Sequence, residues 1–113
     1  MTQTLRENPL PFVILEHHAP GGVHWDLMLQ KADVLWTWRM STPPAAVGSA
    51  GLHAEKSFDH PLRFLTYEGP VQNGAGRVRR VDNGVYTLLR QTPRAVTAVF
   101  ESQTLRGRFT LPL

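Results

Sequence analysis

Three histidines and an aspartate gather within ten positions of this chain, between residues 17 and 26. His24 and Asp26 are two positions apart, so on a β-strand their side chains point to the same face. His18 precedes a Pro-Gly-Gly turn that can fold it back beside them, in the pattern His-x5-His-x-Asp. Two imidazoles and a carboxylate that converge on one point suit a divalent metal ion. The pattern therefore predicts a metal site made by His18, His24 and Asp26, with the adjacent His17 pointing away.

The strand that carries this pattern alternates between two kinds of side chain over residues 23–30, as a half-buried strand does. The apolar set must face the core and consists of Val23, Trp25, Leu27 and Leu29. The other set consists of His24, Asp26, Met28 and Gln30. We expect this second face to line a groove, which is where a reactive metal site has to lie.

A period of two recurs along the chain, and the 3.6-residue period of an amphipathic helix is sustained nowhere. Nine strands are predicted, at residues 12–17, 23–30, 34–40, 52–57, 63–67, 76–81, 85–90, 95–101 and 105–111. Turn-like segments separate them, including Pro20-Gly21-Gly22 and Asp82-Asn83-Gly84. The pattern predicts one all-β domain at residues 11–113, a β-barrel or sandwich, after an N-terminal tail at residues 1–10.

Length and composition limit the function classes. A chain of 113 residues with 42% hydrophobic residues is one domain with a core of its own. No cysteine is present, which excludes disulfides and thiolate metal sites. No apolar run reaches the roughly 18 residues of a membrane span, and residues 1–10 hold no signal-peptide stretch. We therefore expect a cytoplasmic protein that binds no membrane.

The charge is unevenly distributed. Residues 1–76 carry five basic and seven acidic side chains, a net charge of −2, whereas residues 77–113 carry seven arginines and two acidic residues, a net charge of +5. Arginine presents a planar fork that suits phosphate. A polyanionic partner therefore remains open beside the simpler interpretation, a solvated basic face.

A second cluster is Asp59-His60-Pro61-Leu62. Pro61 favours an extended conformation at His60, which places that histidine at a strand edge. His60 is a candidate fourth ligand, or an acid or cation beside the metal.

The order of these motifs resembles the 3′-phosphoesterase domain of bacterial DNA ligase D. In that family a Phe-Val-Ile-x-x-His-x-Ala strand precedes a Leu-His-Tyr-Asp strand, and residues 12–19 and 24–27 here are similar to both. The Asp-His-Pro-Leu motif of the family matches residues 59–62. Weaker likenesses occur at residues 35–38, 68–69, 74–76 and 105–111, so the resemblance covers roughly residues 11–111.

The resemblance implies a small β-barrel with a groove across one side and a hydrolase that trims DNA 3′ ends during repair. It implies a divalent metal, manganese being preferred and zinc, cobalt or iron(II) the alternatives, held here by His18, His24 and Asp26. His60 carries over as the catalytic histidine beside the phosphate. The reaction removes a 3′-phosphate or a 3′-terminal ribonucleotide and leaves a 3′-OH. The implied partners are a DNA 3′ end or primer-template and a separately encoded ligase or polymerase, with the protein itself a monomer.

This sequence departs from the family pattern around the phosphate. The family arginine two positions after the metal aspartate is Met28 here, and the glutamate two positions before the second-motif histidine is Phe58. The candidates for substitute phosphate or DNA contacts are Arg39, His53, Lys56, Arg77 and Arg79. The remaining acid or base candidates near the N-terminus are Arg6, Glu7 and Glu16.

Two other functions therefore stay open. The chain is either a non-catalytic module that binds metal and DNA ends, or a different metal enzyme of the cupin or oxygenase type, in which His24, Asp26 and the distant His60 form a two-histidine, one-carboxylate triad. Identification of the metal would distinguish the cupin or oxygenase type from the phosphoesterase. A turnover assay would distinguish the non-catalytic module from the phosphoesterase.

Overall fold

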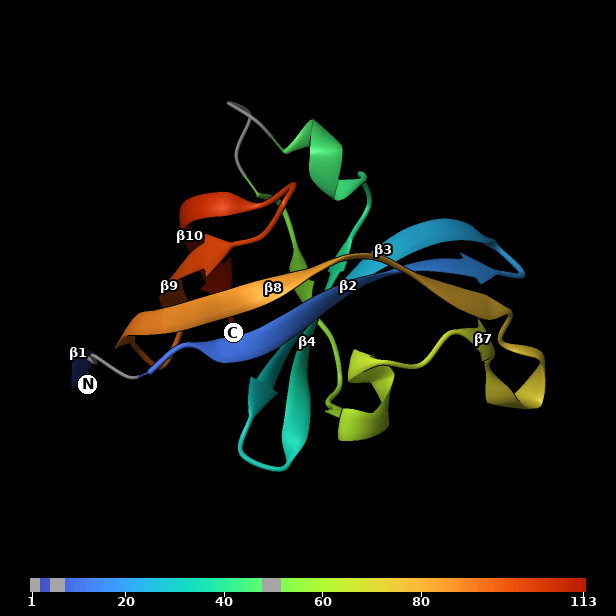
Figure 1. The fold of residues 1–113 in the computed structure, drawn as a ribbon, viewed down its shortest axis with the longest axis horizontal. Coiled ribbons are helices and arrows are strands. Elements are labelled where there is room, and N and C mark those ends of the chain that lie inside the picture. The colour runs from blue at the N-terminus through green and yellow to red at the C-terminus, as the bar shows by residue number, and fades with distance from the viewer. Residues whose placement is uncertain (1–2, 5–7, 48–51) are drawn as a thin grey trace.

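The computed structural model describes residues 3–4, 8–47 and 52–113. They form the strands β1 (Gln3–Thr4), β2 (Leu10–Ala19), β3 (Gly22–Lys31), β4 (Val34–Met40), β5 (Glu55–Lys56), β6 (His60–Pro61), β7 (Gly69–Pro70), β8 (Arg77–Gln91), β9 (Ala95–Glu101) and β10 (Arg106–Pro112) (Figure 1). Three 3₁₀ helices connect them, η1 (Pro44–Ala46), η3 (Leu62–Leu65) and η4 (Gln72–Gly74). No α-helix occurs in these ranges, and none of their helices has the length and apolarity to cross a membrane. The all-β prediction is confirmed.

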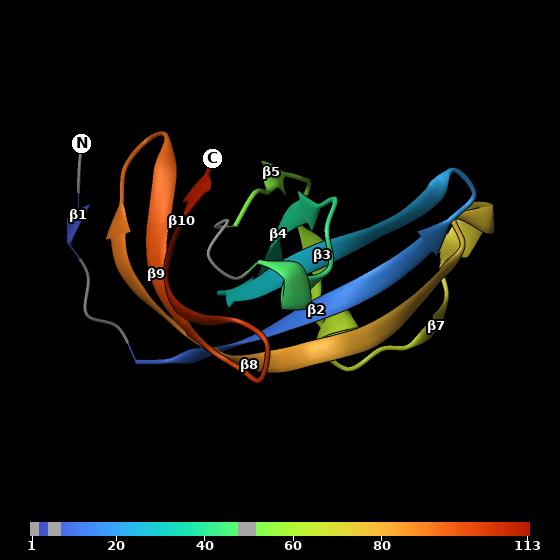
Figure 2. The ribbon, with the colours of Figure 1, turned by 90° about the horizontal axis from the view of Figure 1, so that it is seen from above.

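The strands form one antiparallel sheet in the order β10-β9-β8-β2-β3-β4-β5. The short strands β1 and β7 pair with β8, and β6 pairs with β4. Seen from above, the sheet curls into a half-barrel, with β9 and β10 on one side, β8 and β2 along the base and β3, β4 and β5 on the other side (Figure 2). The long β2, β3 and β8 extend beyond the curled part and carry the residues of interest at their far end.

Strand β2 is buried on both faces, which explains its uninterrupted apolar run at residues 12–15. Phe12 and Ile14 belong to a first core that fills the curled sheet together with Trp38, Tyr86 and other side chains. A second core lies on the opposite face of the sheet. It consists of Val13, Leu15, Met28, Leu35, Phe64 and Val78. The segment at residues 58–76 covers this second core, so that the face predicted to be an open groove is partly filled.

Two predicted strands, residues 76–81 and 85–90, are in fact the single strand β8, so the turn expected at residues 82–84 is wrong. Asp82 accepts hydrogen bonds from the Ser102 hydroxyl, at 2.6 Å, and from the Thr104 backbone amide, at 3.1 Å. Gly84 lies so close to the backbone of Glu101 that a Cβ would be 2.1 Å from the Glu101 carbonyl oxygen. The Asp-Asn-Gly sequence therefore does not reverse the chain. Asp82 binds the turn between β9 and β10, and Gly84 lets β8 and β9 lie close together.

The strand predicted at residues 63–67 is also wrong, because residues 62–65 form η3. Phe64 is buried in the second core, and Leu62 and Leu65 pack against it. These apolar residues therefore cover a face of the sheet and do not form a further strand of it. The strand expected at residues 52–57 is reduced to β5, two residues long.

Candidate metal centre

The β2–β3 hairpin brings His17, His24 and Asp26 together on the sheet face that carries the second core. His17 and His24 are cross-strand partners. The Asp26 Oδ2 atom lies 3.2 Å from His24 Nε2 and 3.6 Å from His17 Nδ1. One donor atom from each of the three residues lies within 4.8 Å of the other two. This is the one such cluster of three or more histidine and acidic donors found within the described residues.

The prediction that His18 joins this cluster while His17 points away is wrong in its geometry. His18 pairs with Val23, and its Nε2 atom lies 2.6 Å from Glu16 Oε1, on the opposite face of the sheet. The turn explains the exchange. Ala19 pairs with Gly22, which leaves two turn residues and makes His17 the partner of His24. That register was implicit in the Pro-Gly dipeptide, because a two-residue turn fixes the partner of every residue in a hairpin.

A backbone carbonyl fixes the orientation of His17. Its Nε2 atom lies 2.6 Å from the Ala75 carbonyl oxygen, which can only accept, so Nε2 donates this hydrogen bond and Nδ1 faces Asp26. The next residue, Gly76, has φ of +97°, and a Cβ there would be 1.9 Å from the His18 carbonyl oxygen. Only glycine lets this segment approach β2 closely enough to deliver the Ala75 carbonyl.

The electrostatics of the cluster favour a bound cation. Asp26 is 5% exposed, and a buried carboxylate is costly unless it is paired or coordinates a metal. Burial lowers the pKa of His24, and the neighbouring Arg39 and His17 lower it too, against the opposing effect of Asp26. A neutral imidazole is the form that ligates metal. Two imidazoles and one carboxylate fit a divalent transition metal such as manganese, zinc or iron.

His60 lies at the rim of this site, held by two hydrogen bonds to the same ring nitrogen. Its Nδ1 atom lies 3.0 Å from the Phe58 carbonyl oxygen and 2.9 Å from Thr37 Oγ1. The carbonyl requires Nδ1 to be the donor, which leaves Nε2 with a free lone pair. Burial lowers the pKa of His60, although Asp26 and the Phe58 carbonyl act in the opposite direction. His60 is not in the three-residue cluster, so the distant triad expected of an oxygenase is not formed among the described residues.

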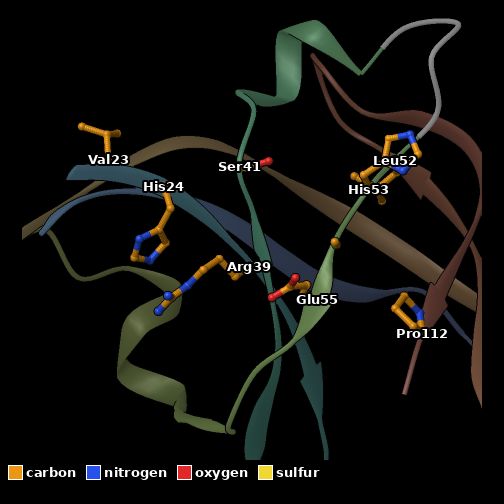
Figure 3. A pocket seen from close by; sticks show the side chains of 9 residues that line it. Val23, His24, Arg39, Ser41, Leu52, His53, Glu55 and Pro112 are labelled. Carbon is orange, nitrogen blue, oxygen red and sulfur yellow. The ribbon is translucent and has the colours of Figure 1, made fainter. Parts of the chain in front are cut away.

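Strand pairing places the cation Arg39 beside the candidate metal centre. It is the cross-strand partner of Asp26 on β4, and its side chain is exposed. Within the described ranges its guanidinium makes no hydrogen bond and no ion pair. Figure 3 shows the Arg39 and His24 side chains extending toward the same side of a pocket of about 490 Å³. Glu55, which the sequence did not bring to attention, is the partner of Arg39 on β5 and lines the same pocket.

The other predicted phosphate contacts lie further away. His53 lines the pocket at the end opposite His24 (Figure 3). Lys56 pairs with Trp38, on the face of β4 opposite Arg39, and its Nζ atom lies 3.6 Å from Asp59 Oδ1.

Arg77 and Arg79 do not border the site either. They are the partners of His18 and Glu16 on the face opposite the cluster, and Arg79 donates to Glu16 Oε1 at 3.1 Å. Hydrogen bonds from His18 and Arg79 lower the pKa of Glu16, which therefore stays ionised there. The candidates Arg6 and Glu7 lie outside the described residues.

A curled antiparallel sheet whose β2–β3 hairpin carries a two-histidine, one-carboxylate cluster defines a small β domain with a candidate metal centre. The family model for the DNA Ligase D 3′-phosphoesterase domain matches residues 15–112, and the chain belongs to this family. The strand motif of this family, Phe-Val-Ile-x-x-His, also places its histidine at His17 rather than His18.

Relatives from two Mycobacterium species match most of the chain. The chain is 38% identical over 81 residues to the multifunctional non-homologous end joining protein LigD of Mycobacterium bovis. The identity is the same to the multifunctional non-homologous end joining DNA repair protein LigD of Mycobacterium tuberculosis. The matches cover 66% of this chain and 10% of each relative, so the chain corresponds to a small part of those proteins.

Proposed function

We propose that this chain is a metal-dependent phosphoesterase that processes DNA 3′ ends in repair. It removes a 3′-phosphate or a 3′-terminal ribonucleotide and leaves a 3′-OH. Membership of the ligase D 3′-phosphoesterase domain family supports the DNA end-processing role. The convergence of His17, His24 and Asp26 beside His60 is the observation that carries the proposal.

The residues divide the work by their chemistry. His17, His24 and Asp26 would hold the metal, for which manganese is our first choice. When bound, such an ion polarises a phosphoryl oxygen and acidifies water. Arg39 is a free guanidinium beside His24, and it can grip the phosphate through a charge-assisted, bidentate pair of hydrogen bonds. It supplies from β4 the positive charge that the family arginine would supply from the position of Met28.

His60 acts as the proton-transfer group in this scheme. Its Nδ1 proton is committed to Phe58 and Thr37, so only Nε2 is free to exchange a proton with the substrate. Because its pKa is lowered, the neutral form prevails near neutral pH, and Nε2 begins the reaction as an acceptor. Thr37 Oγ1 donates in turn to the Leu35 carbonyl at 3.1 Å, which fixes the chain of hydrogen bonds behind the ring.

The proposed substrate and partners rest on the family and its relatives. The relatives' names place them in non-homologous end joining. Chemically, joining two DNA strands requires a 3′-OH. We propose a DNA 3′ end or primer-template as substrate, and a separately encoded ligase or polymerase as the user of the product.

The decisive experiment incubates the protein with a primer-template that ends in a 3′-phosphate, with and without manganese. We expect metal-dependent conversion to a 3′-OH, which Asp26→Asn should abolish. The control Arg94→Ala, in the turn between β8 and β9, should retain it. Conversion that proceeds equally in Asp26→Asn would contradict the proposal.

One observation favours a second candidate, a module that binds metal and DNA ends without turnover. Met28, at the position of the family arginine, is 1% exposed within the second core and cannot reach a phosphate. Manganese-dependent binding of the 3′-phosphate primer-template with no conversion would select this candidate.

A further inference from the structure

An exposed aromatic ring stands beside the site with no structural reason for its exposure. Phe58 is 72% exposed, and the other large exposed hydrophobic residues of the described ranges, Val23 and Leu113, are aliphatic. Burial of a phenylalanine normally contributes about 1.5–3 kcal/mol, which this ring largely forgoes. Its place in the sequence does not force this exposure, because the nearby Phe64 is buried in the second core.

The ring is nevertheless held in a defined place. Phe58 stacks on His60, with ring centroids 4.5 Å apart and an angle of 20° between the planes. The Phe58 carbonyl accepts the His60 Nδ1 proton at 3.0 Å, so backbone and ring act together on the same histidine. The Phe64 ring, which belongs to the second core, lies nearly perpendicular to the His60 ring, with ring centroids 5.6 Å apart. One face of the Phe58 ring is therefore occupied and the other faces solvent.

We propose that the free face of Phe58 is a stacking platform for a nucleobase at the 3′ end of the DNA substrate. This inference rests on the proposed function, since it takes His60 to be the residue that meets the phosphate. In a nucleotide, one sugar separates the 3′-phosphate from its base. At the site, the Phe58 ring lies on His60, the histidine that faces the phosphate, and its other face is free. A base laid on that face extends the stack base–Phe58–His60.

The chemistry of stacking defines what this platform recognises. Every nucleobase has a π-face, so aromatic platforms bind single-stranded ends with little preference for sequence. Arg39 adds a cation for the 3′-phosphate at the site. The platform thus sets affinity for an unpaired or frayed terminal nucleotide, and it leaves the choice among the four bases open.

The competing explanation is that Phe58 only covers and positions His60. The two explanations differ in one respect. A platform acts on the base, so its removal matters only when a base is present, whereas a cover acts on the histidine, so its removal matters for every substrate.

The test uses an oligonucleotide with 2-aminopurine at its 3′ terminus and a 3′-phosphate, because stacking quenches the fluorescence of this base. Binding is measured without added metal, so that turnover does not consume the probe. We expect quenching by the wild type, with affinity reduced about 5- to 100-fold in Phe58→Ala and kept within about twofold in Phe58→Trp. Leu113→Ala, which removes an exposed aliphatic side chain, serves as the matched control and should bind as the wild type does.

A second probe carries an abasic 3′-terminal sugar and a distal fluorophore for anisotropy. We expect Phe58→Ala and the wild type to bind it equally. Equal losses on both probes, or no loss on either, would overturn the inference. Because binding is read without catalysis, Phe58-dependent quenching supports the platform even if no conversion is found. Conversion that persists with unchanged quenching in Phe58→Ala removes the platform and leaves the proposed function intact.

Discussion

His17 and His24 face each other across the β2–β3 hairpin, with their ring centroids 4.7 Å apart. Asp26 lies on the same face, with its Oδ2 atom within 3.6 Å of a nitrogen of each ring. The pairing depends on a turn of only two residues, because any other loop length would place a different residue opposite His24. The geometry of the candidate metal centre therefore depends on the register of one hairpin.

The adjacent histidines His17 and His18 provide an internal control for metal binding. Manganese present at about 100 times its dissociation constant should stabilise the wild type by about 2.7 kcal/mol, a rise in Tm on the order of 10 °C for a domain of this size. We expect His17→Ala to abolish this rise and His18→Ala to retain it. Thermal unfolding followed by circular dichroism, with and without manganese, makes the comparison. If the manganese-dependent rise in Tm disappeared only in His18→Ala, the metal would bind on the opposite face of the sheet, beside His18 and Glu16.

Much of the architecture could be predicted from the sequence because it depends on local patterns. The period-two alternation predicted β4 and β9 with their observed bounds, and it predicted that His24 and Asp26 share a face. The exchange of His17 and His18 was an error of register, since the two-residue turn carried the necessary information.

The second core could not be predicted in this way. The segment at residues 58–76 packs across a sheet face, where residues distant in sequence, such as Phe64 and Met28, join one cluster. No local period reports such packing. The same segment supplies the Ala75 carbonyl that holds His17 and also carries His60, so its contribution to the site could not be predicted without its fold. The Asp-Asn-Gly segment likewise resembles a turn until the close approach of Glu101 to Gly84 is known.

The support that Ala75 gives to His17 should depend on Gly76. Gly76→Ala places a Cβ against the His18 carbonyl at a positive φ, and we expect a loss of about 1–3 kcal/mol in the free energy of unfolding. Displacement of the Ala75 carbonyl should also weaken manganese binding by about 10- to 100-fold, as is typical when the outer partner of a ligand is lost.

Gly74→Ala is the matched control, because Gly74 also has a positive φ but a Cβ there meets nothing within 4 Å. It should show backbone strain of about 1–2 kcal/mol with manganese affinity unchanged. Urea unfolding and calorimetric titration of manganese provide the two measurements. Equal loss of manganese affinity in both variants would argue against a specific role of the Ala75 carbonyl.

Arg39 should contribute to phosphate binding rather than to folding. Its exposed guanidinium has no partner in the described part of the chain, so Arg39→Ala should leave Tm nearly unchanged. Loss of a charge-assisted contact should lower kcat/KM on the 3′-phosphate substrate by about 10- to 100-fold. Arg39→Lys should recover only part of this, because an ammonium lacks the bidentate fork.

Arg79→Ala is the control for Arg39, since Arg79 donates to Glu16 on the opposite face. Its kcat/KM should equal that of the wild type. Met28→Arg should not rescue Arg39→Ala, because it buries an unpaired charge in the second core and destabilises the fold. Steady-state kinetics at several salt concentrations would show the contribution of Arg39 as a salt-dependent KM. A larger loss in Arg79→Ala than in Arg39→Ala would move the phosphate contact to the other face.

Asp82 should make stability depend on pH. Burial alone would raise its pKa, but hydrogen bonds from Ser102, Thr104 and the Asn83 amide outweigh that effect and leave the pKa below its ordinary value. Ionised Asp82 holds the turn between β9 and β10 against β8. Replacement by asparagine should cost about 2–3 kcal/mol at pH 7, the scale of charge-assisted hydrogen bonds.

The sign of the pH dependence follows from the lowered pKa. The folded state binds the Asp82 proton less tightly than the unfolded state does, so the stabilisation is complete above the unfolded pKa of about 3.9. This stabilisation is lost as the pH falls through the lower pKa that Asp82 has in the folded state. The difference in unfolding free energy between wild type and Asp82→Asn should therefore be constant from pH 7 to pH 5 and shrink below about pH 4. Urea unfolding across this range measures it. A difference that grows on acidification would mean that Asp82 is held in its protonated form, and the hydrogen bonds from Ser102 and Thr104 would then need a different assignment.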